Sequence, residues 1–176
     1  MSQIQSPTTQ SSPKNLEIAS FFLASFLGVL FHFVYKWSGQ NSFIGLFFPV
    51  NESTWEHLKL VFFPIVLVSL LEYYVGNLKK EDFICIKLRS ALLGMLATIV
   101  LFYTYTGVLG TVIDWLNIAI YFIAMTLAYS YSYRKLSTHP PQPCSPKLSF
   151  LLFFTIAALF MIFTVYPPSL GLFRAP

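Results

Sequence analysis

Two histidines and two glutamates offer the clearest chemistry in this sequence. Glu52, Glu56 and His57 stand in one short polar segment, and His32 lies upstream, near the end of an apolar run. Imidazole and carboxylate groups are suitable ligands for zinc and similar divalent ions. We therefore take all four residues as candidate metal ligands, and Glu56, His57 and Glu52 as candidate catalytic residues.

The polar segment has the features of a helix start. Ser53 and Glu56 have the S-x-x-E spacing of a capping box, and Asn51 is an alternative cap. Glu52 and Glu56 share a helix face if the helix begins early enough, whereas His57 points about 100° away from Glu56. Three interpretations follow: a metal or catalytic cluster, a hydrogen-bond network that locks the helices together, or part of a proton or solute path. No metalloprotease spacing such as HExxH is present.

The elements that position these residues are membrane helices, because the composition is far from that of a soluble protein. Of the 176 residues, 56% are hydrophobic and 10% are charged, against about 45–50% and about 25% in soluble domains. This composition argues against a soluble enzyme, a disordered chain and a disulfide-stapled secreted domain. The basic residues form no stripe, so we expect no nucleic-acid partner. The expected partner is the lipid bilayer.

Five apolar segments follow a polar tail. Residues 1–14 are rich in Ser, Thr, Gln and Pro, and we expect them to form a disordered tail. Each apolar segment has about 17–21 residues, the length that an α-helix needs to cross a bilayer. The sequence predicts an all-α polytopic bundle, with residues 15–176 forming a single transmembrane domain. Its five transmembrane helices are expected at about residues 16–35, 55–75, 90–106, 115–133 and 148–166.

Basic residues set the predicted orientation. With five spans the two chain ends lie on opposite sides, and eight of the 11 lysines and arginines fall on the side of the N-terminus. The positive-inside rule then places the N-terminus in the cytoplasm and the C-terminus outside, in a plasma or inner membrane. The eight residues are Lys14, Lys79, Lys80, Lys87, Arg89, Arg134, Lys135 and Lys147.

Three further residues belong to the cytoplasmic side in this topology. Cys85 and Cys144 face a reducing compartment, so we expect two reduced thiols and no disulfide. Glu72 lies near the inner end of the second helix. We expect it to snorkel or to pair with a lysine such as Lys79.

The connection between the first two helices is unusual. Residues 36–60 are too many for a tight hairpin, and their apolar middle is expected to lie in the interface or dip into the bundle. Pro64 should kink the second helix and free a carbonyl near Leu60. Pro167 ends the fifth helix, and the apolar residues beyond it predict a segment folded back towards residues 51–57.

The motif NESTWEHLKL, residues 51–60, resembles that of an uncharacterised family of small, mainly bacterial multi-pass membrane proteins. The resemblance covers nearly the whole chain after the tail, and it implies a membrane protein of unknown function. Members often end in an acidic residue before the final proline, where this chain has Ala175, which argues against a catalytic role for the tail. The other matching features are FFP at 62–64, His32 with WSG at 37–39, FYTYTG at 102–107, and YPP at 166–168 with Leu172 and Phe173.

Three functions fit these observations. The first is a binding or structural membrane module in which the outer polar cluster organises a small cavity, with a small-molecule or lipid ligand, a partner subunit or a second copy as partner. The second is a membrane-embedded enzyme that uses a divalent metal on a lipid or peptide at the outer interface. The third is a small transporter, which needs a second polar step, whereas the second helix offers only Ser69 between the cluster and Glu72. No phosphate-binding loop or Ser–His–acid triad is present.

Overall fold

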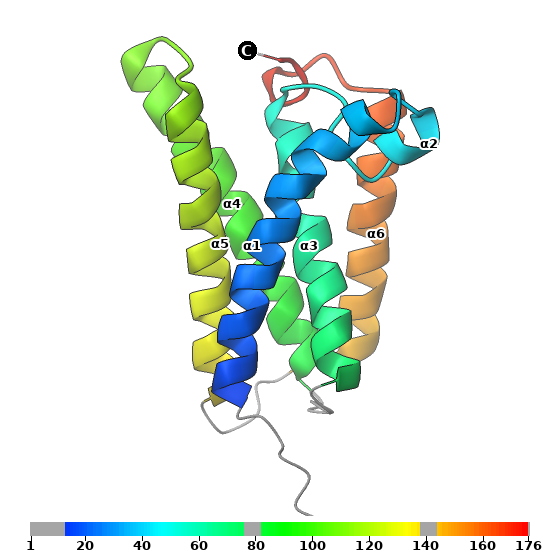
Figure 1. Ribbon diagram of the computed structural model, residues 1–176, viewed down its shortest axis with the longest axis vertical. Helices are drawn as coiled ribbons and strands as arrows, with labels where there is room; N and C mark the ends of the chain where they lie inside the picture. The colour runs from blue at the N-terminus through cyan, green and yellow to red at the C-terminus, as the bar shows by residue number, and fades with distance from the viewer. Residues whose placement is uncertain (1–12, 76–81, 138–143, 176) are drawn as a thin grey trace, which may run out of the picture.

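The computed structural model describes residues 13–75, 82–137 and 144–175, and within these ranges it is entirely helical. The all-α prediction is therefore confirmed for this part of the chain, and each predicted helix corresponds to one long helix (Figure 1). A short helix, α2 (Ser42–Gly45), lies in the first connection, and a 3-10 turn, η1 (Gly171–Phe173), lies near the C-terminus. The long helices are α1 (Pro13–Trp37), α3 (Thr54–Val75), α4 (Phe83–Leu109), α5 (Asp114–Ser137) and α6 (Pro146–Val165).

Four of these helices, α1, α3, α4 and α6, are long and apolar enough to cross a membrane. The helices run side by side, so that α1 begins at one end of the bundle and the chain ends at the other (Figure 1). We call the end that holds α2 and the C-terminal segment the outer end, and the opposite end the inner end, after the predicted topology. The predicted fifth span and the orientation in the membrane stay predictions.

Two helices begin earlier than the apolar runs indicate. α1 begins at Pro13, so the last two residues of the expected tail are helical, and residues 1–12 lie outside the described ranges. α4 begins at Phe83 rather than near residue 90. In α4 the reason is Lys87, which looks like a charge outside the span at residue 90 yet is buried against Glu17 inside the bundle.

α1 and α3 approach each other closely at Gly28. A Cβ atom at this position would lie 2.6 Å from the carbonyl oxygen of Leu60, so any larger residue needs a backbone shift. Pro64 lies inside α3 as predicted, and because it has no N–H, it leaves this Leu60 carbonyl without its usual helical donor. The hydroxyl of Tyr121 on α5 reaches the same place and donates to the carbonyl of Ser25, 2.9 Å away.

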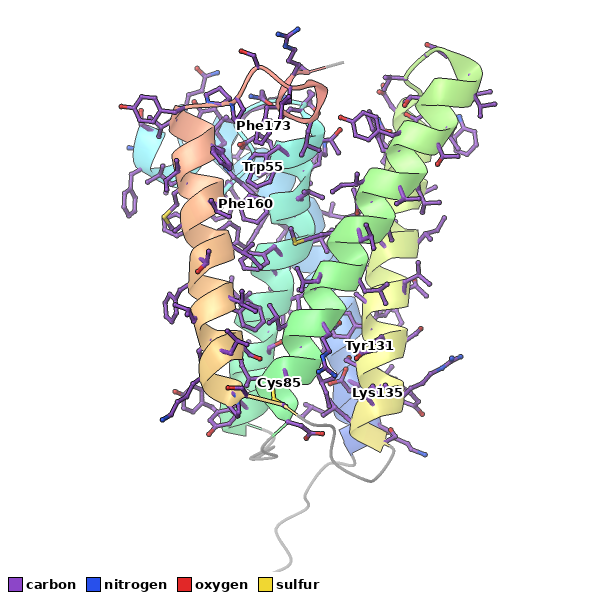
Figure 2. The ribbon with its side chains drawn as sticks, turned by 180° about the vertical axis from the view of Figure 1, so that it is seen from behind. Trp55, Cys85, Tyr131, Lys135, Phe160 and Phe173 are labelled. Atoms are coloured by element: carbon purple, nitrogen blue, oxygen red, sulfur yellow. A yellow bond between two sulfur atoms is a disulfide. The ribbon has the colours of Figure 1, made fainter. Side chains whose placement is uncertain are left out.

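The C-terminal segment folds back over the outer end of α3, as the sequence predicts. Trp55 packs between Phe160 of α6 and Phe173 of η1, with both ring centroids 4.8 Å from its own (Figure 2). These rings cover the side of the first turn of α3 that faces α6. The opposite side of this turn faces α1.

Cys85 and Cys144 form a disulfide, which corrects the expectation of two reduced thiols. The bond ties the first turn of α4 to the residues just before α6, at the inner end (Figure 2). The two Cα atoms lie 6.2 Å apart although 59 positions separate the residues in sequence, so only the packing of α4 and α6 brings them together. The Ser149 hydroxyl lies 3.0 Å from Cys85 Sγ and extends this contact.

Candidate metal site at the outer end

Three of the four candidate ligands, His32, Glu52 and His57, lie together; we call them the outer histidine site. One ligand atom from each residue can be chosen so that all three lie within 4.8 Å of one another. His57 Nε2 lies 3.4 Å from Glu52 Oε2, and His32 Nε2 lies 3.9 Å from Glu52 Oε1. The imidazole centroids are 5.5 Å apart. The carboxylate therefore bridges the two rings.

The start of α3 decides which glutamate reaches the site. The helix begins at Thr54, so Glu52 precedes it and does not share a helix face with Glu56. The Asn51 side chain accepts a hydrogen bond from the backbone N–H of Ser53 (2.9 Å), which forms the turn that carries Glu52. Only half of the predicted capping box is present: the N–H of Glu56 points to the Ser53 hydroxyl at 3.4 Å, while the Glu56 carboxylate turns elsewhere.

The backbone fixes the tautomer of His57. Its Nδ1 lies 3.0 Å from the carbonyl oxygen of Ser53, and a carbonyl only accepts, so Nδ1 carries the hydrogen. Nε2 then faces the carboxylate of Glu52. Two anionic or lone-pair groups in such contact repel unless a proton or a metal ion lies between them. The pair is therefore either an imidazolium–carboxylate ion pair or two ligands of one cation.

His32 reaches the site because of the close approach at Gly28. These residues are four apart on α1, so they lie on one face of the helix, and Leu60 and His57 are three apart on α3. The Gly28–Leu60 contact thus sets the distance between the helices one turn below the histidines. A sequence pattern shows that His32 lies near the outer end, but not which way its ring faces.

Partial exposure and the neighbouring imidazoles govern the charge of Glu52. The hydrogen-bonding contact with His57 holds the pKa of Glu52 below its usual value, and the charges of His57, His32 and Lys36 act in the same direction. Partial burial opposes them. Glu52, with 57% of its side chain exposed, is therefore ionised at neutral pH and available as an anionic ligand.

The outer histidine site lies in the wall of a cavity of about 550 Å³. α1 and α3 form one side of the cavity and α4 and α5 the other, and the outer ends of α4 and α5 lean away from α1 (Figure 1). Apolar side chains such as Phe102 and Ile118 share the lining with Thr54, Asn117 and Tyr121. Asn117 of α5 accepts a hydrogen bond from the Tyr105 hydroxyl of α4 (2.6 Å).

The geometry fits a divalent ion such as zinc. Ligand atoms at about 2.0–2.2 Å from a tetrahedral zinc lie about 3.3–3.5 Å from one another. The distance from His57 Nε2 to Glu52 Oε2, 3.4 Å, already has this value, and the distance from His32 Nε2 to the other oxygen of Glu52, 3.9 Å, exceeds it by about half an ångström. The Ser53 carbonyl on His57 Nδ1 is the kind of support that orients a metal-binding imidazole. A tetrahedral ion held by these three residues would keep a fourth position for a further ligand, and the cavity lies beside them.

Glu56, the fourth candidate, belongs to a separate network on the other side of α3. Its carboxylate accepts from Lys59 Nζ (2.7 Å) and from the N–H of Val50 (3.0 Å), and it lies 2.9 Å from the Thr164 hydroxyl of α6. Lys59 Nζ also donates to the carbonyl of Gly45 (2.9 Å). Glu56 and Lys59 are 2% and 0% exposed, so this Glu56–Lys59 network ties α3 to α6 and to the α2 segment.

Sequence reasoning missed a second group of buried charges at the inner end. Glu72 pairs with a lysine as predicted, but the lysine is Lys87, and residues 76–81, which include Lys79, lie outside the described ranges. Lys87 also pairs with Glu17 of α1. No spacing rule connects these positions. The available signal was three ionisable residues at the predicted inner edges of three different spans.

Comparison with known proteins gives a family and no assigned activity. No curated protein and no solved structure matches the chain. A family model described as a family of unknown function, DUF6512, matches residues 6–176, which includes every residue of the outer histidine site. The resemblance to an uncharacterised family is thereby confirmed, and the chain belongs to DUF6512.

Proposed function

We propose that this chain is a binding module of the plasma or inner membrane that holds a divalent metal ion, zinc in the first place, at the outer histidine site. The observation that carries the proposal is the convergence of two imidazoles and one carboxylate within 4.8 Å. The three residues come from α1, from the first connection and from α3, so only the folded bundle assembles the site. The cavity beside them gives the ion access to a further ligand.

The membrane part of the proposal has five spans, with α5 as the additional one. α5 packs along α4 and α1, which supports its place inside the bundle. The count of basic residues supports a cytoplasmic inner end. Two of the 11 basic residues, Lys59 and Lys87, are completely buried and cannot act as loop charges. Without them the margin is seven to two, and the predicted orientation is unchanged.

A metal-dependent enzyme is the second candidate, and the open fourth position favours it. Catalytic zinc sites combine three protein ligands with one position for water or substrate, whereas structural sites are closed. A bound zinc would supply an activated water or polarise a carbonyl. The chain's own contribution would be to hold a lipid or peptide between α1 and α5, where Thr54 and Asn117 line the cavity.

Metal analysis of the purified full chain tests the metal site. After zinc addition and removal of free ion, we expect about one zinc per wild-type chain and none above background in His57→Ala or His32→Ala. Zinc at about 100 times its dissociation constant should raise the free energy of unfolding by about 2.7 kcal/mol in wild type. Glu56→Gln is the matched control, because it weakens the Glu56–Lys59 network and lowers thermal stability while the zinc content stays the same. Wild type without bound ion, or His57→Ala with equal content, contradicts the proposal.

A further inference from the structure

Three fully buried charges from three helices meet at the inner end. Glu17 of α1 and Glu72 of α3 are each 2% exposed, and Lys87 of α4 is 0% exposed. Lys87 Nζ lies 2.5 Å from Glu17 Oε1 and 2.6 Å from Glu72 Oε2. The Ser132 hydroxyl of α5 donates to Glu17 Oε2. We call Glu17, Glu72, Lys87 and Ser132 the inner charge cluster.

The charges of this cluster do not balance. Two ionised carboxylates and one ammonium leave one negative charge, and an uncompensated charge removed from water is costly. Within the described ranges, two uncharged aromatic rings lie beside the ammonium: Lys87 Nζ is 5.1 Å from the Tyr129 ring centroid and 5.6 Å from that of Phe83. Arg134 of α5 is exposed, at the rim of the cavity that reaches Glu17. The cluster therefore needs one more positive charge.

The hydrogen bonds indicate which carboxylate takes it. Glu17 accepts from both Lys87 and Ser132, one bond to each oxygen, which is the pattern of an ionised carboxylate. Glu72 Oε2 lies 2.6 Å from Lys87 Nζ, and Ser20 of α1 lies beside the carboxyl group. Neither Glu72 oxygen makes a hydrogen bond of good geometry within the described ranges, whereas both oxygens of Glu17 do. Glu72 is therefore the carboxyl group with room for a proton.

A small cavity between α1 and α5 reaches Glu17 of the cluster. It has a volume of about 340 Å³, and Glu17, Tyr129, Tyr133 and Arg134 are among the residues that line it. The Tyr129 hydroxyl is buried and has no hydrogen-bond partner in the described part of the chain. Buried polar atoms of this kind are normally satisfied by water. A water held there would connect the cavity to the carboxylates.

We propose that the inner charge cluster is a proton-binding site, which carries one exchangeable proton on Glu72 and exchanges it through the cavity beside Tyr129. The site lies at the opposite end of the bundle from the outer histidine site and does not depend on metal binding.

The charge balance predicts how many protons the carboxyl groups of the cluster bind in each variant. Each substitution therefore has its own expected result. Infrared spectroscopy of the full chain in lipid nanodiscs detects the C=O stretch of a protonated carboxyl group. At neutral pH we expect this band in wild type and its loss in Glu72→Gln. We also expect its loss in Glu17→Gln, since Glu72 then ionises to pair with Lys87. Lys87→Met should double the band area, because both carboxylates then bind a proton.

The controls separate the proposal from its alternatives. Glu52→Gln at the outer end should leave the band unchanged. The two single glutamine variants keep one carboxylate for one ammonium, so they fold and stay informative even if Lys87→Met does not. A wild type without the band, or a band that persists in Glu17→Gln, overturns the proposal. Thermal stability should also be the same when choline replaces sodium; sodium-dependent stability without the band makes a sodium ion the occupant and overturns it as well.

Discussion

The outer histidine site and the inner charge cluster use similar groups in opposite ways. Both join carboxylates to basic side chains from different helices. At the outer site His32, His57 and Glu52 have 29%, 28% and 57% of their side chains exposed, whereas no charged member of the inner cluster exceeds 2%. Exposure lets an outer ion and its ligands exchange with solvent. At the inner cluster, burial makes any unbalanced charge destabilise the folded protein.

The largest effect should come from removing the inner cation. Lys87→Met leaves two carboxylates buried without their partner, and breaking a buried pair in this way costs about 3–5 kcal/mol. His57→Ala, in the absence of metal, should cost less than about 1 kcal/mol, because its surroundings are open to solvent. Chemical unfolding of the two variants in the same detergent measures the difference. Lys36→Met, at an exposed position, is the control and should stay within about 0.5 kcal/mol of wild type.

Equal stability of Lys87→Met and His57→Ala would show that the two sites are equally solvated. The difference in side-chain exposure would then have no effect on the free energy of unfolding. An intermediate loss that shrinks at acidic pH would support the contrast, because both buried carboxyl groups of Lys87→Met must bind a proton on folding and acidic pH lowers the cost of that uptake.

The disulfide gives the next largest effect, again at the inner end. A bond between Cys85 and Cys144 closes a long loop, and its removal in Cys85→Ser should cost about 2–4 kcal/mol. Zinc content at the outer end should not change. The measurement is thermal unfolding with and without reductant, together with alkylation of free thiols before cell lysis. Wild type that is fully alkylated in cells would show that the bond is absent there.

The disulfide and the basic residues favour different compartments for the same end of the bundle. Disulfides persist in oxidising compartments, while an excess of lysine and arginine marks the cytoplasmic side. Reporter fusions to the C-terminus decide between them, because the C-terminal segment lies at the outer end (Figure 1) and the disulfide at the inner end (Figure 2). If the C-terminus lies outside and Cys85 and Cys144 are oxidised, the disulfide lies on the cytoplasmic side. It would then be an exception to the rule that cytoplasmic thiols stay reduced.

The helices could be predicted from the sequence because length and hydropathy are local properties. The site could be predicted only in part. His32, Glu52 and His57 were identified by residue type, but Glu56 looks equivalent to Glu52 until the start of α3 at Thr54 turns them to different partners.

The inner cluster shows what local patterns cannot give. Glu17 and Lys87 are 70 positions apart, and each resembles an ordinary interfacial charge at the edge of its own span. The disulfide was missed for the same reason, since nothing near Cys85 or Cys144 indicates a partner 59 positions away. Pairings of this kind depend on which helices are neighbours, and that follows from packing.

The smallest effect tests how the outer site is positioned. Gly28→Ala places a methyl group against the Tyr121 hydroxyl and the Leu60 carbonyl, so Tyr121 must move and α1 and α3 must separate, at a cost of about 1–3 kcal/mol for overpacking. The same separation moves His32 away from His57, and we expect zinc affinity to fall by about tenfold or more. Gly107→Ala is the matched control: nothing lies within 4 Å of a Cβ atom there, so it should gain about 0.5–1 kcal/mol and bind zinc normally. If Gly28→Ala bound zinc as tightly as wild type, the helix contact would not set the distance between the histidines, and the outer site would be adaptable where the inner cluster is fixed.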